Sequence, residues 1–179
     1  MDKKSRTRRE LVRVCLSAML LSMSVVIGYA SKSIFASVDG LFRISLDSLP
    51  IIIAGILLGP LWGGAIGAAS DLVTYFITPQ TFAPIPLVTV GYAMLGIVSG
   101  ILARYVLKKE GNMRLVLSTV GAHFIGSTVF KVIGLYSIYG ALVFIRIPIY
   151  ILVAAVESLI ICLLFKSRAF KKVCEEFKL

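Results

Sequence analysis

The chain has few of the side chains from which metal centres and acid–base catalytic sites are built. It contains one histidine, three cysteines and nine acidic residues among 179 positions. Cys15, Cys162 and Cys174 have neither metal nor redox spacing, and their odd number argues against a disulfide framework. A phosphate-binding loop, a metalloprotease motif and a nucleophile elbow are also missing from the sequence. We therefore expect no metal, no cofactor and no catalytic residue. If the protein moves a substrate actively, ATP hydrolysis must reside in another chain.

Apolar residues dominate the composition instead. They make up 58% of the chain, with a mean hydropathy of +0.94, whereas a soluble domain averages about 45–50%. This composition predicts an all-α integral membrane protein in which residues 1–179 form a single transmembrane domain in the lipid bilayer. The net charge of +10 is explained by membrane topology, so no nucleic-acid partner is expected.

Positive charge lies mostly in three stretches. Fifteen of the nineteen Lys and Arg residues fall within residues 3–13, 104–114 and 166–178. Lys and Arg in short loops mark the cytoplasmic side of a membrane protein. Three basic stretches on one side require an even number of crossings between each pair, so both termini are predicted to be cytoplasmic, with basic tails at about 1–10 and 166–179.

A compact bundle of six transmembrane helices satisfies this parity. The apolar segments are 11–30, 46–58, 61–77, 87–107, 115–135 and 142–165. A crossing needs about 20 residues, so the second segment must be tilted, extended toward 41–45 or covered by protein at its end. Gly59-Pro60 is expected to end it, and the Gly and Ala residues that follow predict close helix packing.

Four basic residues lie outside the three stretches: Lys32, Arg43, Lys131 and Arg146. In the predicted topology, Arg43, Lys131 and Arg146 reach the same outer level from three different segments. An ionisable side chain at membrane depth indicates a functional site by default, although a long cationic side chain near a helix end also extends to the interface. Lys32 is interpreted as a plain loop charge.

Polar and aromatic side chains are predicted near these three cations: Tyr75, Thr78, Gln80, Thr81, Phe82, Tyr136 and Tyr139. This combination suits a planar, anionic small molecule, because rings stack on aromatic side chains and Arg holds a carboxylate bidentately. Asp71 is about 10 Å deeper than Thr78 at helical rise. It either accepts from a ligand amino group or pairs with Lys131 or Arg146.

Three further polar residues have structural interpretations. Glu157 is expected to hydrogen-bond to Ser, Thr or Tyr of another segment, and His123 to be packed or hydrogen-bonded within its own. Asp47 most simply pairs with Arg43 at i,i+4 spacing.

Several sequence blocks carry a family resemblance. Arg43 to Pro50 leads into a Gly-Pro-x-x-Gly-x-x-x-Gly-x-x-x-Asp run from Gly59 to Asp71, and Leu135 to Pro148 forms the turn into the last segment. The whole pattern resembles the substrate-binding S-components of energy-coupling factor (ECF) vitamin transporters, and most closely the folate-type (FolT) family. It departs from that family at Pro84-Ile85-Pro86, where folate-type members usually have Pro-Gly-Phe.

The resemblance implies a transport subunit of the bacterial plasma membrane that captures folate, or a reduced folate, on the outer side. It would deliver the vitamin inward with an EcfT-type transmembrane coupling protein and two cytoplasmic ATPases. The implied substrate-binding residues are Arg43, Asp71, Tyr75, Gln80, Thr81, Phe82, Lys131, Tyr136 and Arg146. Ala18 and Ser22, a small-x-x-x-small pair, match the coupling face of the family; their alternative role is packing inside the bundle.

Three alternatives stay open at this stage. The S-component could take another vitamin or a precursor. A small membrane enzyme acting on lipid would need a compact acid–base or metal set, which the scattered His123, Asp71 and Glu157 do not supply. A structural or assembly protein would leave the three outer cations unexplained.

Overall fold

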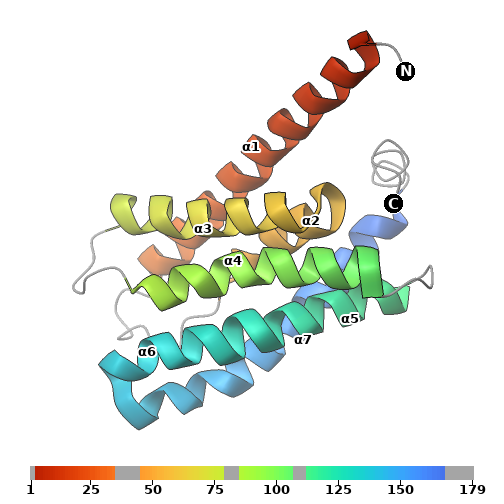
Figure 1. Ribbon diagram of the computed structural model, residues 1–179. Helices are drawn as coiled ribbons and strands as arrows, with labels where there is room; N and C mark the ends of the chain where they lie inside the picture. Colours follow the sequence, from red (N-terminus) through yellow and green to blue (C-terminus); the bar gives the residue numbers. More distant parts are fainter. Residues whose placement is uncertain (1–2, 35–44, 79–84, 107–111, 168–179) are drawn as a thin grey trace.

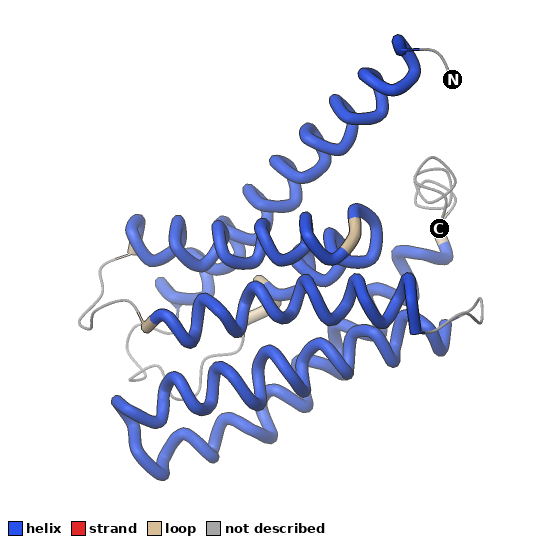
Figure 2. Tube along the Cα trace, in the orientation of Figure 1, coloured by secondary structure: helices blue, strands red, loops and turns tan. Residues whose placement is uncertain are grey.

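Every regular element in the described part of the chain is helical. The computed structural model describes residues 3–34, 45–78, 85–106 and 112–167, and no strand occurs in these ranges (Figures 1 and 2). The elements are α1 (Lys3–Ile34), α2 (Ser48–Leu58), α3 (Pro60–Ile77), α4 (Pro86–Ile101), the π-helix η1 (Leu102–Val106), α5 (Asn112–Ala122), the π-helix η2 (His123–Lys131), α6 (Val132–Tyr139), the 3₁₀-helix η3 (Gly140–Ile145) and α7 (Arg146–Lys166). Because η1 continues α4, η2 joins α5 to α6, and η3 leads into α7, these elements form six helical rods.

Four of the rods are long and apolar enough to cross a membrane. They are Glu10–Ile34, Pro86–Val106, Met113–Ser137 and Gly140–Lys166. The prediction of an all-α membrane protein is thus confirmed at this level. A count of six complete crossings stays a prediction, because α2 has 11 residues and α3 has 18, which correspond to lengths of about 16 and 27 Å.

The short helix α2 is covered by protein on every side. All of its residues from Ser48 to Leu58 are buried, which agrees with protein coverage, one of the three ways expected for a segment too short to cross a membrane. Gly59 ends it with a φ of 105°, in the left-handed region that favours glycine, and Pro60 starts α3.

Arg104 hydrogen-bonds to backbone carbonyls at the C-terminal end of α2. Its guanidinium donates from Nε to the carbonyl of Ile56 at 3.3 Å and from a terminal nitrogen to the carbonyl of Leu57. The last carbonyls of a buried helix need such partners, and a cation there also complements the helix dipole. Arg104 was predicted only as part of a basic loop; it lies in η1 and stabilises α2. The contact also places the Gly59-Pro60 turn and the end of η1 on the same side, as the charge parity predicts.

Three glycines allow α2, α3 and α4 to pack with their backbones in contact. A Cβ atom added to Gly63 would lie 2.6 Å from the Cα of Gly55 and 2.7 Å from the carbonyl oxygen of Gly96. Small residues permit this close approach. The close packing expected of segment 61–77 is confirmed.

The rods place their ends in two groups (Figure 1). The start of α1, the α2–α3 turn and the C-terminal ends of η1 and α7 lie at one end of the molecule, and the α6–η3 turn lies at the other with the start of α4 and the end of α3. We call the end with the α6–η3 turn the outer end, after the predicted topology; which end faces the cytoplasm stays a prediction.

Helix α1 is longer than expected and leans on the bundle with its C-terminal half. It ends at Ile34 rather than near Ala30, and its N-terminal part projects away from the other helices (Figure 1). Lys32 is therefore helical, and its Nζ donates to Thr78 Oγ1 at 3.4 Å. The interpretation of Lys32 as a plain loop charge was wrong, because this side chain joins the end of α1 to the end of α3.

Candidate functional site

A buried cation, a ring and a carboxylate meet toward the outer end of the bundle. Lys131 Nζ lies 3.3 Å from the centroid of the Tyr92 ring, and the Tyr92 hydroxyl donates to Asp47 Oδ2 at 2.7 Å. The three residues, which we call the outer cluster, are 7%, 8% and 6% exposed, respectively. Charges removed from water are costly unless they are paired and hydrogen-bonded, and here one tyrosine contacts both the cation and the anion.

Four elements, α1, α2, α4 and η2, hold the outer cluster in place. Asp47 precedes the first turn of α2, and its backbone carbonyl accepts a 2.7 Å hydrogen bond from Ser24 of α1. Tyr92 comes from α4, and Lys131 ends η2. Helix α4 and η2 approach closely at glycines, since a Cβ added to Gly91 would lie 2.8 Å from both the carbonyl oxygen of Gly126 and the Lys131 side chain.

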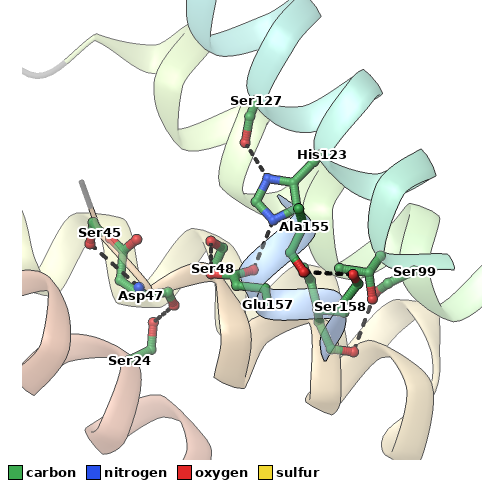
Figure 3. Close-up of polar contacts among 12 residues, drawn as sticks. Ser24, Ser45, Asp47, Ser48, Ser99, His123, Ser127, Ala155, Glu157 and Ser158 are labelled. Atoms are coloured by element: carbon green, nitrogen blue, oxygen red, sulfur yellow. Dashed lines mark hydrogen bonds and ion pairs between the residues drawn. The ribbon is translucent and has the colours of Figure 1, made fainter. Parts of the chain in front are cut away.

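A second buried polar group lies beside the first. Ser48 Oγ donates to Glu157 Oε1 at 2.7 Å, His123 Nε2 lies 2.8 Å from Glu157 Oε2, and His123 Nδ1 lies 3.2 Å from Ser127 Oγ (Figure 3). Glu157 is fully buried, and both of its oxygens are hydrogen-bonded. The structural interpretations of Glu157 and His123 are therefore confirmed, and we call Ser48, Glu157 and His123 the inner chain.

Asp71 is half-buried on α3 and faces α4. Its Oδ2 accepts a 2.7 Å hydrogen bond from Thr89 Oγ1. In the described part of the chain it makes no ion pair with Lys131 or Arg146, so that alternative is wrong. A role in ligand binding stays a prediction.

Arg146 and the predicted aromatic residues are spread around the outer end. The Arg146 guanidinium carbon lies 5.8 Å from the Tyr139 ring centroid, and its NH1 lies 3.5 Å from the Tyr150 hydroxyl. Tyr136 packs against Phe144 and is 53% exposed, which places it on the outside of the bundle. Lys131 and Arg146 thus each lie against tyrosines, but different ones.

The remaining predicted binding residues, Arg43, Gln80, Thr81 and Phe82, lie outside the described residues. The same holds for the expected pair between Arg43 and Asp47. In the sequence they belong to the stretches between α1 and α2 and between α3 and α4. Tyr75, on α3, packs edge-to-face against Phe76 with a 5.6 Å centroid distance.

Sequence reasoning missed Tyr92 and Thr89, which bind the two outer carboxylates. A usable signal existed, because Thr89, Tyr92 and Ser99 are polar residues at helical spacing in an otherwise apolar segment. All three face neighbouring helices and hydrogen-bond to them.

Ala18 and Ser22 lie one turn apart on the exposed side of α1, where Ser22 Oγ donates to the Ala18 carbonyl at 2.8 Å. Ser17 and Ser24 are buried on the same helix. Packing inside the bundle is therefore the wrong interpretation of this pair, and the coupling face stays a prediction.

Comparison with known families agrees with this architecture. Residues 12–172 match the family model for the ECF transporter, substrate-specific component, and a comparison with curated proteins found no match. Proteins of this family are membrane-embedded transport subunits that bind a small-molecule substrate and work with an EcfT-type coupling protein and ATPases. Because the match spans most of the sequence, the chain belongs to the family of ECF transporter substrate-specific components.

Proposed function

We propose that this S-component captures folate or a reduced folate at the outer side of the bacterial plasma membrane. It passes the vitamin inward together with an EcfT-type coupling protein and two cytoplasmic ATPases, and it hydrolyses no ATP itself. The observation that carries the proposal is the outer cluster, in which a buried Lys131 lies on the face of Tyr92 within a chain of this transport family.

The chemistry of the outer end favours a ligand that is planar and anionic. A buried ammonium is a partner for a carboxylate, and tyrosine faces stack on rings. Asp71 uses one oxygen to accept from Thr89, and an ionised carboxylate has about four acceptor positions. It retains capacity for an amino group on a pyrimidine edge.

The proposal gives each end of folate its own partners. The glutamate tail meets some of Arg43, Lys131 and Arg146, and the pterin lies deeper, near Asp71, Tyr75 and Phe82. Gln80, Thr81 and Tyr136 complete the substrate-binding set proposed from the sequence. Tyr136 is 53% exposed and lies at the edge of the proposed site.

One observation favours a second ligand within the same class. Pro84-Ile85-Pro86 stands where folate-type sequences usually have Pro-Gly-Phe, and it immediately precedes and begins α4, which carries Thr89 and Tyr92. A different vitamin or precursor would fit a changed entrance of this kind. Membership of a transport family argues against the lipid-enzyme and assembly-protein alternatives.

Mass spectrometry of small molecules retained by the detergent-purified protein tests the proposal. A folate present in stoichiometric amount would support both the class and the ligand. A different vitamin would keep the S-component and replace folate. An empty protein that shows no calorimetric binding of added folic acid would overturn the assignment of folate.

A further inference from the structure

The outer cluster and the inner chain meet at two consecutive residues. Asp47 accepts from Tyr92, and Ser48 donates to Glu157. Asp47 precedes and Ser48 begins α2, so the first turn of this helix links the two buried polar groups. Each bond is 2.7 Å long and involves a carboxylate, and hydrogen bonds of this kind are roughly twice as strong as neutral ones.

The carboxylate of Asp47 does not perform the usual task of an aspartate at the start of a helix. An N-cap aspartate normally accepts from the backbone N–H groups of the first turn, but Asp47 makes no side-chain cap hydrogen bond. Its side chain is directed to Tyr92 instead. The contacts that hold the start of α2 therefore also contribute to the position of the carboxylate.

The inner chain is one such contact, in addition to the bond from Ser24 of α1 to the Asp47 carbonyl. Ser48 binds a carboxylate that is 0% exposed and whose second oxygen is bonded to His123 of the α5–η2–α6 rod. Glu157 is shielded from bulk solvent, so loosening Ser48 leaves a buried acceptor unsatisfied. A shift of Ser48 changes the hydrogen bonding of Glu157, and Glu157 passes this change to the imidazole.

We propose that Ser48, Glu157 and His123 are positioning residues for the ligand site: they set the place of Asp47, and through it the orientation of Tyr92 beneath Lys131. The proposal rests on the proposed function, because it takes the outer cluster as part of the ligand site. Binding of a ligand at the outer cluster then changes the hydrogen bonding of the His123 imidazole, although His123 does not touch the ligand.

The sequence offers a clean probe, because His123 is the one histidine of the chain. Protein labelled with ¹⁵N-histidine gives imidazole nitrogen signals from this side chain alone. The first measurement needs no ligand: Tyr92→Phe keeps the aromatic ring, and with it the ring current, but removes the hydroxyl bond to Asp47. We expect it to shift the His123 signals in the wild-type background and to leave them unchanged in a Ser48→Ala background.

Ser158→Ala is the matched control. Ser158 neighbours Glu157 on α7 and is buried, but its hydroxyl donates at 2.8 Å to the carbonyl of Ala155 in its own helix (Figure 3). In this background Tyr92→Phe should still shift the His123 signals. Absence of any shift in the wild-type background, or an equal shift with Ser48→Ala, would overturn the proposal.

Folic acid provides the second measurement. Titrated into the labelled wild-type protein, it should shift the His123 signals. Ser48→Ala should weaken calorimetric binding about tenfold, within the range typical of the coupling free energy between two sites, while Ser158→Ala should leave it within twofold. Binding of folic acid with equal affinity in both variants, or with no change at His123, would overturn the positioning role while leaving the proposed function standing. If the wild type does not bind folic acid, the assignment of folate fails, and the ligand-free comparison decides the positioning role by itself.

Discussion

Within the proposed function, Lys131 is the residue whose surroundings most restrict the choice of ligand. Its ammonium is buried against the Tyr92 ring, and a cation–π contact removed from water contributes about 2 kcal/mol. A ligand that draws Lys131 away from the ring must therefore offer a compensating negative charge. This favours carboxylate-bearing vitamins over neutral ones.

We expect Lys131→Met to lower the affinity for folic acid at least tenfold. Methionine keeps an unbranched apolar side chain but has no charge for the glutamate tail, and hydrogen bonds to charged groups contribute about 1.5–3 kcal/mol. Isothermal titration calorimetry of the detergent-purified variant measures the change. Lys166→Met, at the exposed end of α7, is the control and should bind as the wild type does. Unchanged affinity in both Lys131→Met and Arg146→Ala would contradict the placement of the tail.

Arg104 has a structural task at the opposite end of the molecule. We expect Arg104→Met to lower the free energy of unfolding by about 1.5–3 kcal/mol, because the buried carbonyls at the end of α2 lose a charged donor. Arg104→Lys should recover only part of this, since an ammonium lacks the planar fork of a guanidinium. Thermal unfolding in detergent measures both variants. Arg13→Met, which removes a 3.0 Å exposed pair with Glu10, should cost less than 1 kcal/mol; an equal loss would show that Arg104 acts as a surface charge.

Helices α2, α3 and α4 depend on glycine where they touch. Backbone contact at Gly55, Gly63 and Gly96 leaves no room for a side chain. This contact holds the buried α2 in place, and α2 in turn carries Asp47 and Ser48 at its start. The short helix α2 thus connects the glycine contacts to the proposed ligand site.

Gly63→Leu should therefore be among the most damaging substitutions in α3. The added side chain would overlap the backbones of α2 and α4. Overpacking of this kind lowers the free energy of unfolding by about 1–3 kcal/mol or more. Ala65→Leu is the control on the same helix, because Ala65 is exposed. Detergent-solubilised yield and the midpoint of thermal unfolding distinguish the two variants, and equal stability would show that the three helices separate easily.

The helical elements themselves were largely predictable from apolar segment lengths, whereas their irregular turns were not. Predicted ends at Leu58 and Ile77 agree with α2 and α3, since Gly59-Pro60 marks one boundary in the sequence. No local feature of the sequence predicted the π-helix η2, which begins at His123 and ends at Lys131. A π-helix arises where tertiary packing favours it, and such turns are frequent at functional sites.

At the scale of the whole molecule, α1 presents a free face that the other helices do not cover. Ala18 and Ser22 lie on this face, and small residues allow a second membrane protein to approach closely. We expect Ala18→Trp to reduce co-purification with the EcfT-type coupling protein and the ATPases, while folic acid binding is unchanged. Met19→Trp, at an adjacent position that is 70% exposed, is the control; equal loss in both variants, or in neither, would contradict a coupling face at Ala18.

The grouping of rod ends also makes a topological prediction. The N-terminal end of α1 and the C-terminal end of α7 lie at the end that carries the α2–α3 turn (Figure 1), and this end is predicted to be cytoplasmic by the positive-inside rule. Reporter fusions at the N- and C-termini should both be active in the cytoplasm. A periplasmic or extracellular signal from either terminus would refute the even number of crossings.

Composition and charge pattern, read from the sequence alone, determined the all-helical membrane class, the helix-breaking Gly59-Pro60 turn and the two-ended arrangement of the rods, because hydropathy and local backbone preference act over short stretches. Only the tertiary structure decided which polar residues meet. Tyr92 binds Asp47, and Ser48 binds Glu157. Asp71 accepts from Thr89 rather than pairing with Lys131. A buried donor or acceptor must find a partner wherever the fold brings one, and that pairing depends on how helices distant in sequence rotate against each other at their glycine contacts.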